Sequence, residues 1–167
     1  MLNHHKVITS PVGALTLIAT EKGLAAILWE NDNPDRIAVD LGTRDEQHPV
    51  LLETERQLNE YFTGKRKRFE LTLDFIGTDF QKQVWQALLT IPYGVTRTYG
   101  EIAQQLNNPQ SVRAIGGAAN RNPISIIAPC HRVVGSSGKL VGFAGGLDRK
   151  NRLLRLEGAI KQTSLWE

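Results

Sequence analysis

The residues best suited to covalent chemistry lie together at Cys130-His131-Arg132, which includes the only cysteine of the 167-residue chain. An imidazole and a fixed cation beside a thiol are the neighbours that lower a thiol pKa from about 8.5 and raise its thiolate fraction. On an extended segment, however, adjacent side chains point to opposite faces, so His131 reaches Cys130 only if a turn intervenes. An inert cysteine that packs as a small hydrophobe is the alternative, and the three residues alone leave both interpretations open.

The segment before the cysteine is mostly apolar from Ile124 to Ala128, with Ser125 inside it, and predicts a short buried strand. Pro129 would end that strand, because proline fixes its own φ and has no N–H to donate to a sheet. We therefore expect Cys130 at a strand end rather than inside a helix.

Composition narrows the class of protein. The length and apolar content predict a globular chain of one ordinary domain or two small ones, able to bury a core. One cysteine excludes an internal disulfide and a multi-cysteine zinc site, and a free thiol fits a reducing compartment. No stretch is apolar and long enough for a signal peptide or a membrane span, and His4 and His5 lack nearby carboxylate or thiol partners. We expect a cytoplasmic protein without a metal or a cofactor.

Charge is distributed unevenly along the chain. Residues 1–75 carry 9 Lys and Arg against 12 Asp and Glu, a net charge of −3, whereas residues 76–167 carry 11 against 5, a net charge of +6. This asymmetry predicts two domains, 1–75 and 76–167. The second could bind a polyanion such as nucleic acid, or it could have an ordinary solvated basic surface.

The first 75 residues predict a small mixed sheet with one helix. Apolar or β-branched residues at 6–9, 14–20 and 24–29 are separated by turn residues at hairpin spacing. Residues 69–75 alternate apolar and polar side chains, as a half-buried strand does. Residues 49–62 carry a helical apolar stripe. No chemistry stands out in this part, and its role is expected to be architectural.

The second part is predicted to be helical. Thr78 and Gln81 form a capping box that begins one helix, and Thr98 and Glu101 form another that begins a second. A third helix is expected at about 110–120. Two short helices joined by three or four residues are typical of a helix-turn-helix.

Small residues gather in the third of these helices, where Gly116 and Gly117 each cost roughly 1 kcal/mol of helix stability relative to alanine. A helix with that cost is expected to approach another backbone closely, either in the core or on a ligand. A last helix is predicted at about 147–156, with Gly158 as its left-handed terminator.

The order of these motifs resembles the O6-alkylguanine-DNA alkyltransferase family, the methylated-DNA–protein-cysteine methyltransferases that repair DNA by direct reversal. The resemblance is specific over about 80–158, where the helix-turn-helix is followed by Asn-Pro at 122–123, Ile-Ile-Ala-Pro-Cys-His-Arg-Val at 126–133 and Leu-Glu-Gly at 156–158. It implies an α/β fold: an N-terminal ribonuclease-H-like mixed sheet with a helix, and a C-terminal helical domain with a winged-helix or helix-turn-helix DNA-binding motif.

The resemblance also implies roles around the cysteine. Cys130 would be the alkyl acceptor, His131 would take its proton through a water, and Glu157 would hold the imidazole in the required tautomer. Asn122 would shape the turn that carries Cys130. Tyr99 would meet a DNA phosphate, assist nucleotide rotation and donate toward the flipped purine. Each residue also has an ordinary structural interpretation, in packing, helix capping or a solvated surface.

Further positions are implied at the DNA and at the base. Arg113 would enter the duplex through the minor groove and fill the space that the base leaves. The backbone at Val133 and Ala144 would contact the extruded guanine. Phe143 stands where a tyrosine is expected in many members, so a hydrogen bond near the alkyl pocket is missing and the substrate range is in question. The remaining implied DNA contacts lie on the same helix, at Ser111, Ala114, Gly116 and Gly117.

The implied reaction is irreversible transfer of an alkyl group to Cys130 from O6 of guanine, and from O4 of thymine, in duplex DNA. A thioether resists hydrolysis and the chain has no second thiol, so each molecule would react only once. The protein is expected to be a monomer, and the sequence leaves open whether it binds DNA cooperatively. Two other classes of protein are alternatives to this interpretation. A non-catalytic binder of alkylation damage would need no thiol, and a cysteine hydrolase usually brings nucleophile and base together from distant segments.

Overall fold

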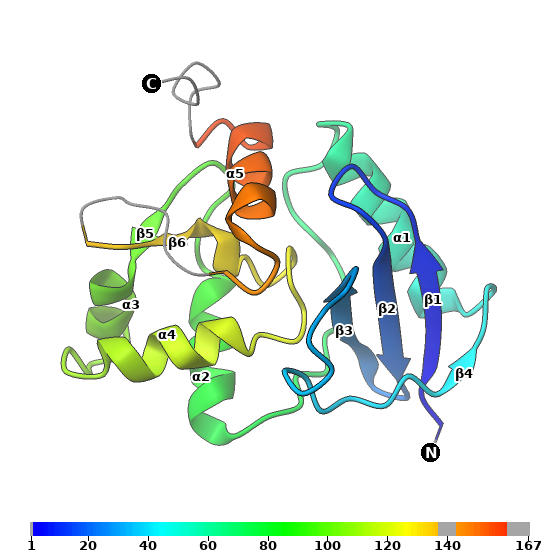
Figure 1. Cartoon of the computed structure of the whole chain (residues 1–167), viewed down its shortest axis with the longest axis horizontal. Coiled ribbons are helices and arrows are strands. Elements are labelled where there is room, and N and C mark those ends of the chain that lie inside the picture. The colour runs from blue at the N-terminus through cyan, green and yellow to red at the C-terminus, as the bar shows by residue number, and fades with distance from the viewer. Residues whose placement is uncertain (1, 137–142, 160–167) are drawn as a thin grey trace. The chain divides into compact units, whose positions relative to one another are not determined.

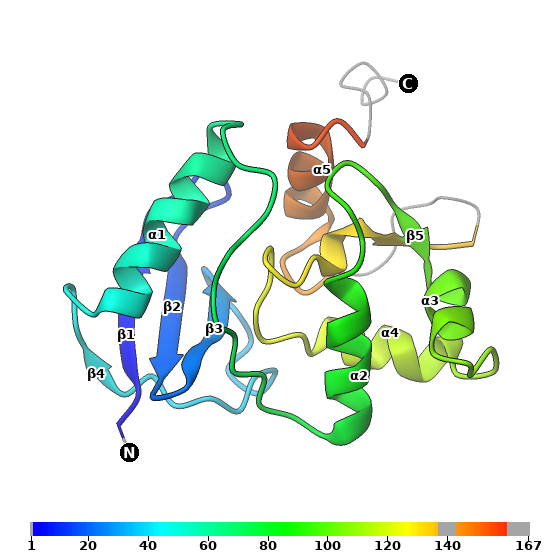
Figure 2. The same ribbon diagram turned by 180° about the vertical axis from the view of Figure 1, so that it is seen from behind.

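The computed structural model describes residues 2–136 and 143–159, which form two compact units. Within the described residues, the first unit comprises 2–76 together with Pro123–Ser125, and the second comprises Gly77–Asn122 together with 126–136 and 143–159. Both are visible in Figure 1, and again from behind in Figure 2.

The first unit is a four-stranded sheet with a helix along it. The strand order is β3-β2-β1-β4, in which β1 (His4–Ile8), β2 (Leu15–Thr20) and β3 (Gly23–Trp29) are antiparallel neighbours. The short β4 (Thr43–Arg44) pairs in parallel with β1. Helix α1 (Pro49–Phe62) lies along the sheet in Figure 2, and its buried residues are Leu51, Thr54, Gln57, Leu58 and Tyr61. The three expected hairpin strands and the expected helix are confirmed.

The strand predicted at 69–75 is wrong. Only Leu73 forms a ladder contact, as an isolated parallel bridge to Leu24. The backbone-to-backbone hydrogen bonds here both involve Leu24, whose N–H donates to Thr72 O at 2.9 Å and whose carbonyl accepts from Asp74 N at 2.8 Å. The alternating pattern correctly indicates an extended, half-buried segment, but one partner residue is too few to continue a ladder.

The strand predicted at 124–128 is also wrong. Ile124 forms an isolated bridge with Ile27, and the Ile27 N–H donates to Pro123 O at 2.8 Å, both within the first unit. The next three residues form a turn, in which Ile126 has a φ of +75°. A left-handed residue ends a strand at once, because its backbone cannot continue the pleat.

The second unit is mainly helical. Its elements are α2 (Asp79–Leu88), β5 (Arg97–Thr98), α3 (Tyr99–Gln105), α4 (Val112–Asn120), the 3₁₀ turn η1 (Cys130–Arg132), β6 (Val133–Val134) and α5 (Leu147–Leu156). Both predicted capping boxes are confirmed: Thr78 begins α2 and Thr98 begins α3, each with its reciprocal side-chain partner three residues later. Strands β5 and β6 pair in parallel.

Helix α4 packs against both α2 and α3, which gives the helix-turn-helix a rigid base. The indole N–H of Trp85 donates to Ala118 O at 2.8 Å, so α2 is tied to the backbone of α4 by a buried hydrogen bond. Ile102 from α3 and Ile115 from α4 are buried in the same unit. The outer face of α4 is thereby left exposed.

Candidate active site

Cys130 lies in the 3₁₀ turn η1 rather than at a strand end. The turn is closed by Arg132 N, which donates to Pro129 O at 2.9 Å. A turn therefore does follow the cysteine, so Cys130 and His131 are not on the opposite faces of an extended segment. Cys130 is 6% exposed and His131 is fully buried.

Asn122 joins the end of α4 to the cysteine. Its Nδ2 donates to Ala128 O at 2.7 Å and to Cys130 Sγ at 3.2 Å, and the side chain is completely buried. An N–H directed at sulfur stabilises a thiolate more than a thiol, because hydrogen bonding to the charged form favours that form. Asn122 thus both fixes the loop and favours negative charge on the sulfur.

A buried carboxylate orients the imidazole. Glu157 Oε2 lies 2.8 Å from His131 Nε2, and Arg132 donates to the same carboxylate through Nε at 2.8 Å and Nη2 at 2.9 Å. An ionised carboxylate only accepts, so Nε2 must carry the hydrogen and Nδ1 keeps its lone pair. Among the described residues Nδ1 has no hydrogen-bond partner. His131 therefore presents a basic nitrogen.

The electrostatics keep the carboxylate charged and the imidazole neutral. Burial opposes charge on Glu157, but the hydrogen bonds from His131 and Arg132 outweigh it and hold the pKa of Glu157 well below its usual range. Burial lowers the pKa of His131; Glu157 opposes this, and the positive charges of Arg132 and Lys150 add to it. The resting site thus holds a neutral base beside a fixed ion pair.

Two charged residues of this cluster were not predicted from the sequence as site residues. Arg132 also donates through Nη1 to Ile91 O at 2.6 Å. Lys150 is fully buried and donates from Nζ to Val133 O at 2.6 Å. Lys150 lies three residues before the buried Leu153 and seven before Glu157, so its helical spacing was the available signal.

Tyr99 lies close to both the cysteine and α4. Burial raises the pKa of Tyr99, and negative charge at Cys130 raises it further. A Cβ built on Gly116 would lie 3.9 Å from Cε1 of the tyrosine, an ordinary contact. The half-buried phenol is therefore near enough to the sulfur to feel its charge.

The outer face of α4 carries the residues implied for DNA. Arg113, Ala114 and Gly117 are exposed, while Ser111 donates from its hydroxyl to Asn108 O at 2.8 Å. A Cβ added at Gly117 would meet nothing within 4 Å. Close packing inside the unit therefore does not explain why this position is a glycine.

The residues implied for base binding gather near Lys150. Val133 is buried in β6, and its carbonyl accepts from Lys150 Nζ. Phe143 and Ala144 are half-buried, with the Lys150 Nζ 5.8 Å from the centre of the Phe143 ring. The turn after Phe143 is closed by Gly146 N, which donates to Phe143 O at 2.9 Å.

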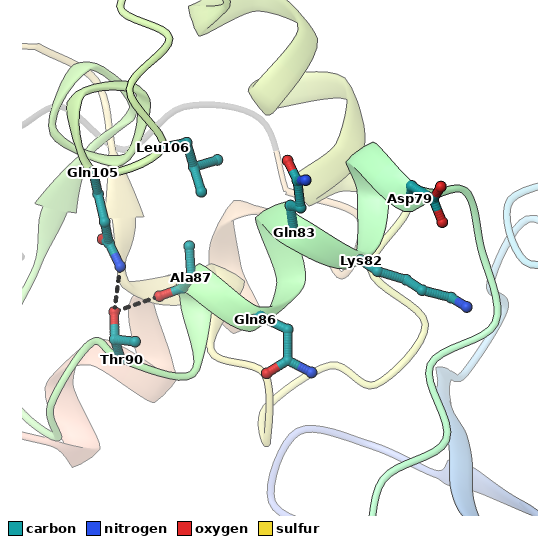
Figure 3. Close-up of a pocket in the computed structure, with 8 residues that line it drawn as sticks. All are labelled: Asp79, Lys82, Gln83, Gln86, Ala87, Thr90, Gln105 and Leu106. Atoms are coloured by element: carbon teal, nitrogen blue, oxygen red, sulfur yellow. Dashed lines mark hydrogen bonds between the residues drawn. The ribbon is translucent and has the colours of Figure 1, made fainter.

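A separate groove of about 710 Å³ lies on α2 and α3, and Figure 3 shows the residues that line it. Gln105 Nε2 donates to Thr90 Oγ1 at 3.1 Å, and that hydroxyl donates to Ala87 O at 2.6 Å. None of the cysteine's neighbours lines it, so it is not the reaction site. Over the residues that the structure describes, no cluster could hold a metal ion and no helix is long and apolar enough to cross a membrane.

Fold and site together define a two-unit α/β protein with a buried cysteine, a carboxylate-oriented imidazole and an adjacent helix-turn-helix. Two protein-family models match the chain. Residues 3–75 match the ribonuclease-like domain of 6-O-methylguanine DNA methyltransferase, and residues 79–159 match its DNA-binding domain. The chain therefore belongs to the O6-methylguanine DNA methyltransferase family, and the predicted fold class is confirmed.

Similar proteins agree over almost the whole chain. The methylated-DNA–protein-cysteine methyltransferase of Methanosarcina acetivorans is 47% identical, covering 93% of this chain and 99% of the relative. The protein of the same name from Mycobacterium bovis is 48% identical, covering 92% of each. The crystal structure of Mycobacterium tuberculosis OGT in complex with DNA superposes with a TM-score of 0.85 at 45% identity, covering 98% of this chain and 99% of that one.

Proposed function

We propose that the protein repairs alkylated DNA by direct reversal, as a single-turnover methylated-DNA–protein-cysteine methyltransferase. Its substrate is an alkyl group on O6 of guanine, or O4 of thymine, in duplex DNA, and the acceptor is Cys130. The observation that carries the proposal is the buried thiol held by Asn122 beside the His131–Glu157–Arg132 cluster, in a chain of this family. No cofactor takes part.

The geometry supports a defined sequence of proton and bond changes. His131 Nδ1 takes the thiol proton through a water, and Glu157 stabilises the resulting imidazolium because its carboxylate already accepts from Nε2. The sulfur then forms a bond to the alkyl carbon as the carbon–O6 bond breaks, and the electron pair passes to guanine. Tyr99 donates a proton toward the purine, and the thioether on Cys130 remains.

Binding to DNA is assigned to α4. Arg113 and Ala114 are exposed, and Gly116 and Gly117 add no side chain that would keep a ligand at a distance. A helix with such a surface can approach the minor groove closely, and Arg113 can fill the space left by an extruded base. The backbone at Val133 and Ala144, with the Phe143 ring, would then receive the guanine.

The proposal also includes the domain boundaries, the oligomeric state and the localisation. We place the ribonuclease-like domain at 1–75 and the DNA-binding and acceptor domain at 76–167, in keeping with the two family matches. We assign the protein to the cytoplasm, because its only thiol must stay reduced to react. We also take it to act as a monomer. A non-catalytic damage binder is the weaker alternative, because such a protein needs neither Cys130 nor an oriented imidazole.

The experiment that tests the proposal is the intact mass of the protein after mixing with a duplex that carries one O6-methylguanine, followed by peptide mapping. We expect a gain of one methylene on the peptide containing Cys130, saturating at one per protein. Cys130→Ser is the matched control, because it should bind the same duplex and gain nothing. Binding without mass gain in the wild type would favour the damage binder, and neither binding nor gain would contradict the proposal entirely.

A further inference from the structure

The loop between Asn122 and Cys130 contains the only β-branched residue with a positive φ in the described chain. Ile126 has a φ of +75°, in the left-handed region, and its side chain is 1% exposed. For an L-residue this conformation crowds Cβ against the following carbonyl oxygen, and a branch at Cβ makes the crowding worse. An isoleucine is therefore among the residues least suited to this position.

Elsewhere the described chain gives such positions to residues that tolerate them. The other non-glycine residues with positive φ are asparagines, Asn31 at 61° and Asn107 at 56°. Glycine takes the rest, for example Gly94 and Gly158, each at 77°. Strain that persists next to a reactive group is a reason to look for a function.

The turn at Ile126 returns the chain to Asn122. Ala128 O accepts from Asn122 Nδ2 at 2.7 Å and from Cys130 N at 2.8 Å. The second bond, with Pro129 at φ −83° and ψ 66° between its partners, forms an inverse γ-turn. Asn122 Nδ2 also reaches Cys130 Sγ, so one amide holds both the loop backbone and the sulfur.

We infer that Ile126 is a positioning residue for alkyl transfer: its buried side chain locks the left-handed turn that holds Ala128 and the Cys130 sulfur against Asn122. Glycine would permit the same φ but also many others, so the sulfur would lose its fixed position. Because the readout is alkyl transfer, this inference rests on the proposed function.

The first test compares Ile126→Gly with Ile126→Ala, using the same pair of changes at Ile127 as the control. Ile127 is the same residue type, is 7% exposed and is not among the residues with positive φ. At Ile127 the glycine variant should have a folded-to-unfolded ratio roughly two- to fivefold lower than the alanine variant. At Ile126 the order should reverse, because glycine relieves the crowding that alanine keeps.

The second test separates positioning from stability, at a temperature at which every variant is folded. With saturating duplex carrying O6-methylguanine, Ile126→Gly should transfer the methyl group about tenfold more slowly than wild type, since small misplacements of a nucleophile are costly. Without DNA, iodoacetamide should alkylate its thiol faster than in wild type, because the sulfur is no longer held. Ile126→Val and both Ile127 variants should keep both rates near wild type.

These outcomes decide between the alternatives. If wild type transfers and Ile126→Gly matches it in both rates, Ile126 does not position the sulfur. If glycine is less stable than alanine at Ile126, the strained turn is absent and the inference fails. A wild type that transfers nothing overturns the proposed function, while the stability order and iodoacetamide rates still test the turn. An Ile126→Gly variant that does not fold where Ile126→Ala does is the less stable of the two, and therefore also contradicts the inference.

Discussion

Two of the arginine–carboxylate clusters in the described residues differ mainly in burial. On α1, Arg56 bridges Glu53 and Glu60 with side chains that are 53%, 42% and 35% exposed. In the second unit, Arg132 and Glu157 form the same kind of pair with side chains 8% and 0% exposed. Similar hydrogen-bond geometry should therefore contribute very differently to stability when solvent is removed.

The physical reason lies in what happens when one partner is lost. An exposed carboxylate that loses its arginine is solvated by water, so the pair contributes little. A buried carboxylate or guanidinium that loses its partner stays behind as an uncompensated charge in a medium of low dielectric. The buried cluster should therefore govern both stability and chemistry, and the exposed one neither.

The largest effect is expected for Glu157→Ala. This change leaves Arg132 buried without its carboxylate and His131 without its orienting acceptor, which should lower the free energy of unfolding by about 3–5 kcal/mol. Urea unfolding at pH 7 measures it, with Glu53→Ala on α1 as the matched control. Equal losses for the two variants would contradict the comparison.

Acid should destabilise the folded protein through the same buried cluster. The pKa of Glu157 is lowered from 4.5, so the stability it contributes is present above pH 4.5 and is lost as pH falls toward the folded-state pKa. The pKa of His131 is lowered from 6.5, so below pH 6.5 the unfolded chain takes up a proton that the folded protein refuses. As pH falls, each of these protons lowers the free energy of unfolding by at most about 1.4 kcal/mol per pH unit.

Unfolding free energies measured from pH 7 to pH 4 check this expectation. Glu157→Gln should flatten the lower part of the curve, because no carboxylate remains there to protonate, and His131→Asn should flatten the part just below pH 6.5. A curve unchanged by both variants would mean that the acid sensitivity arises elsewhere.

Local features of this arrangement could be predicted from the sequence, and long-range ones could not. The capping boxes at Thr78 and Thr98 were predictable because both partners lie within three residues. The bidentate bond between Arg132 and Glu157 spans 25 residues, and no local sequence pattern predicts it. The resemblance to a family supplied Glu157 but gave Arg132 no role.

The error at 124–128 has a different cause. A short apolar segment has the same composition whether it forms a buried strand or a buried turn, so periodicity cannot separate them. The conformation of Ile126 is imposed by the surrounding structure against the preference of the residue itself. Such positions defeat prediction from sequence because local preference and tertiary structure disagree there.

An effect of intermediate size on the free energy of unfolding is expected from Lys150, at alkaline pH. Burial lowers its pKa from 10.5 to about 8, so between these values the unfolded chain binds more protons and stability rises with pH, by about 1 kcal/mol per unit. Lys150→Met should lack this rise, while losing the hydrogen bond to Val133 O at every pH. The measurement is the difference in unfolding free energy between wild type and variant at pH 7 and pH 10. A difference that does not change with pH would contradict the assignment.

The smallest effect is expected for Arg56→Ala on α1. Hydrogen bonds from Arg56 and Gln57 lower the pKa of Glu53 to about 2, yet the Glu53 and Arg56 side chains are largely in water. Removing the guanidinium should therefore lower the unfolding free energy only slightly, and added salt should reduce that loss further. Urea unfolding at low and at high salt measures both, and alkyl transfer should not change. A loss as large as that of Glu157→Ala would show that hydrogen-bond geometry, rather than burial, sets the weight of these pairs.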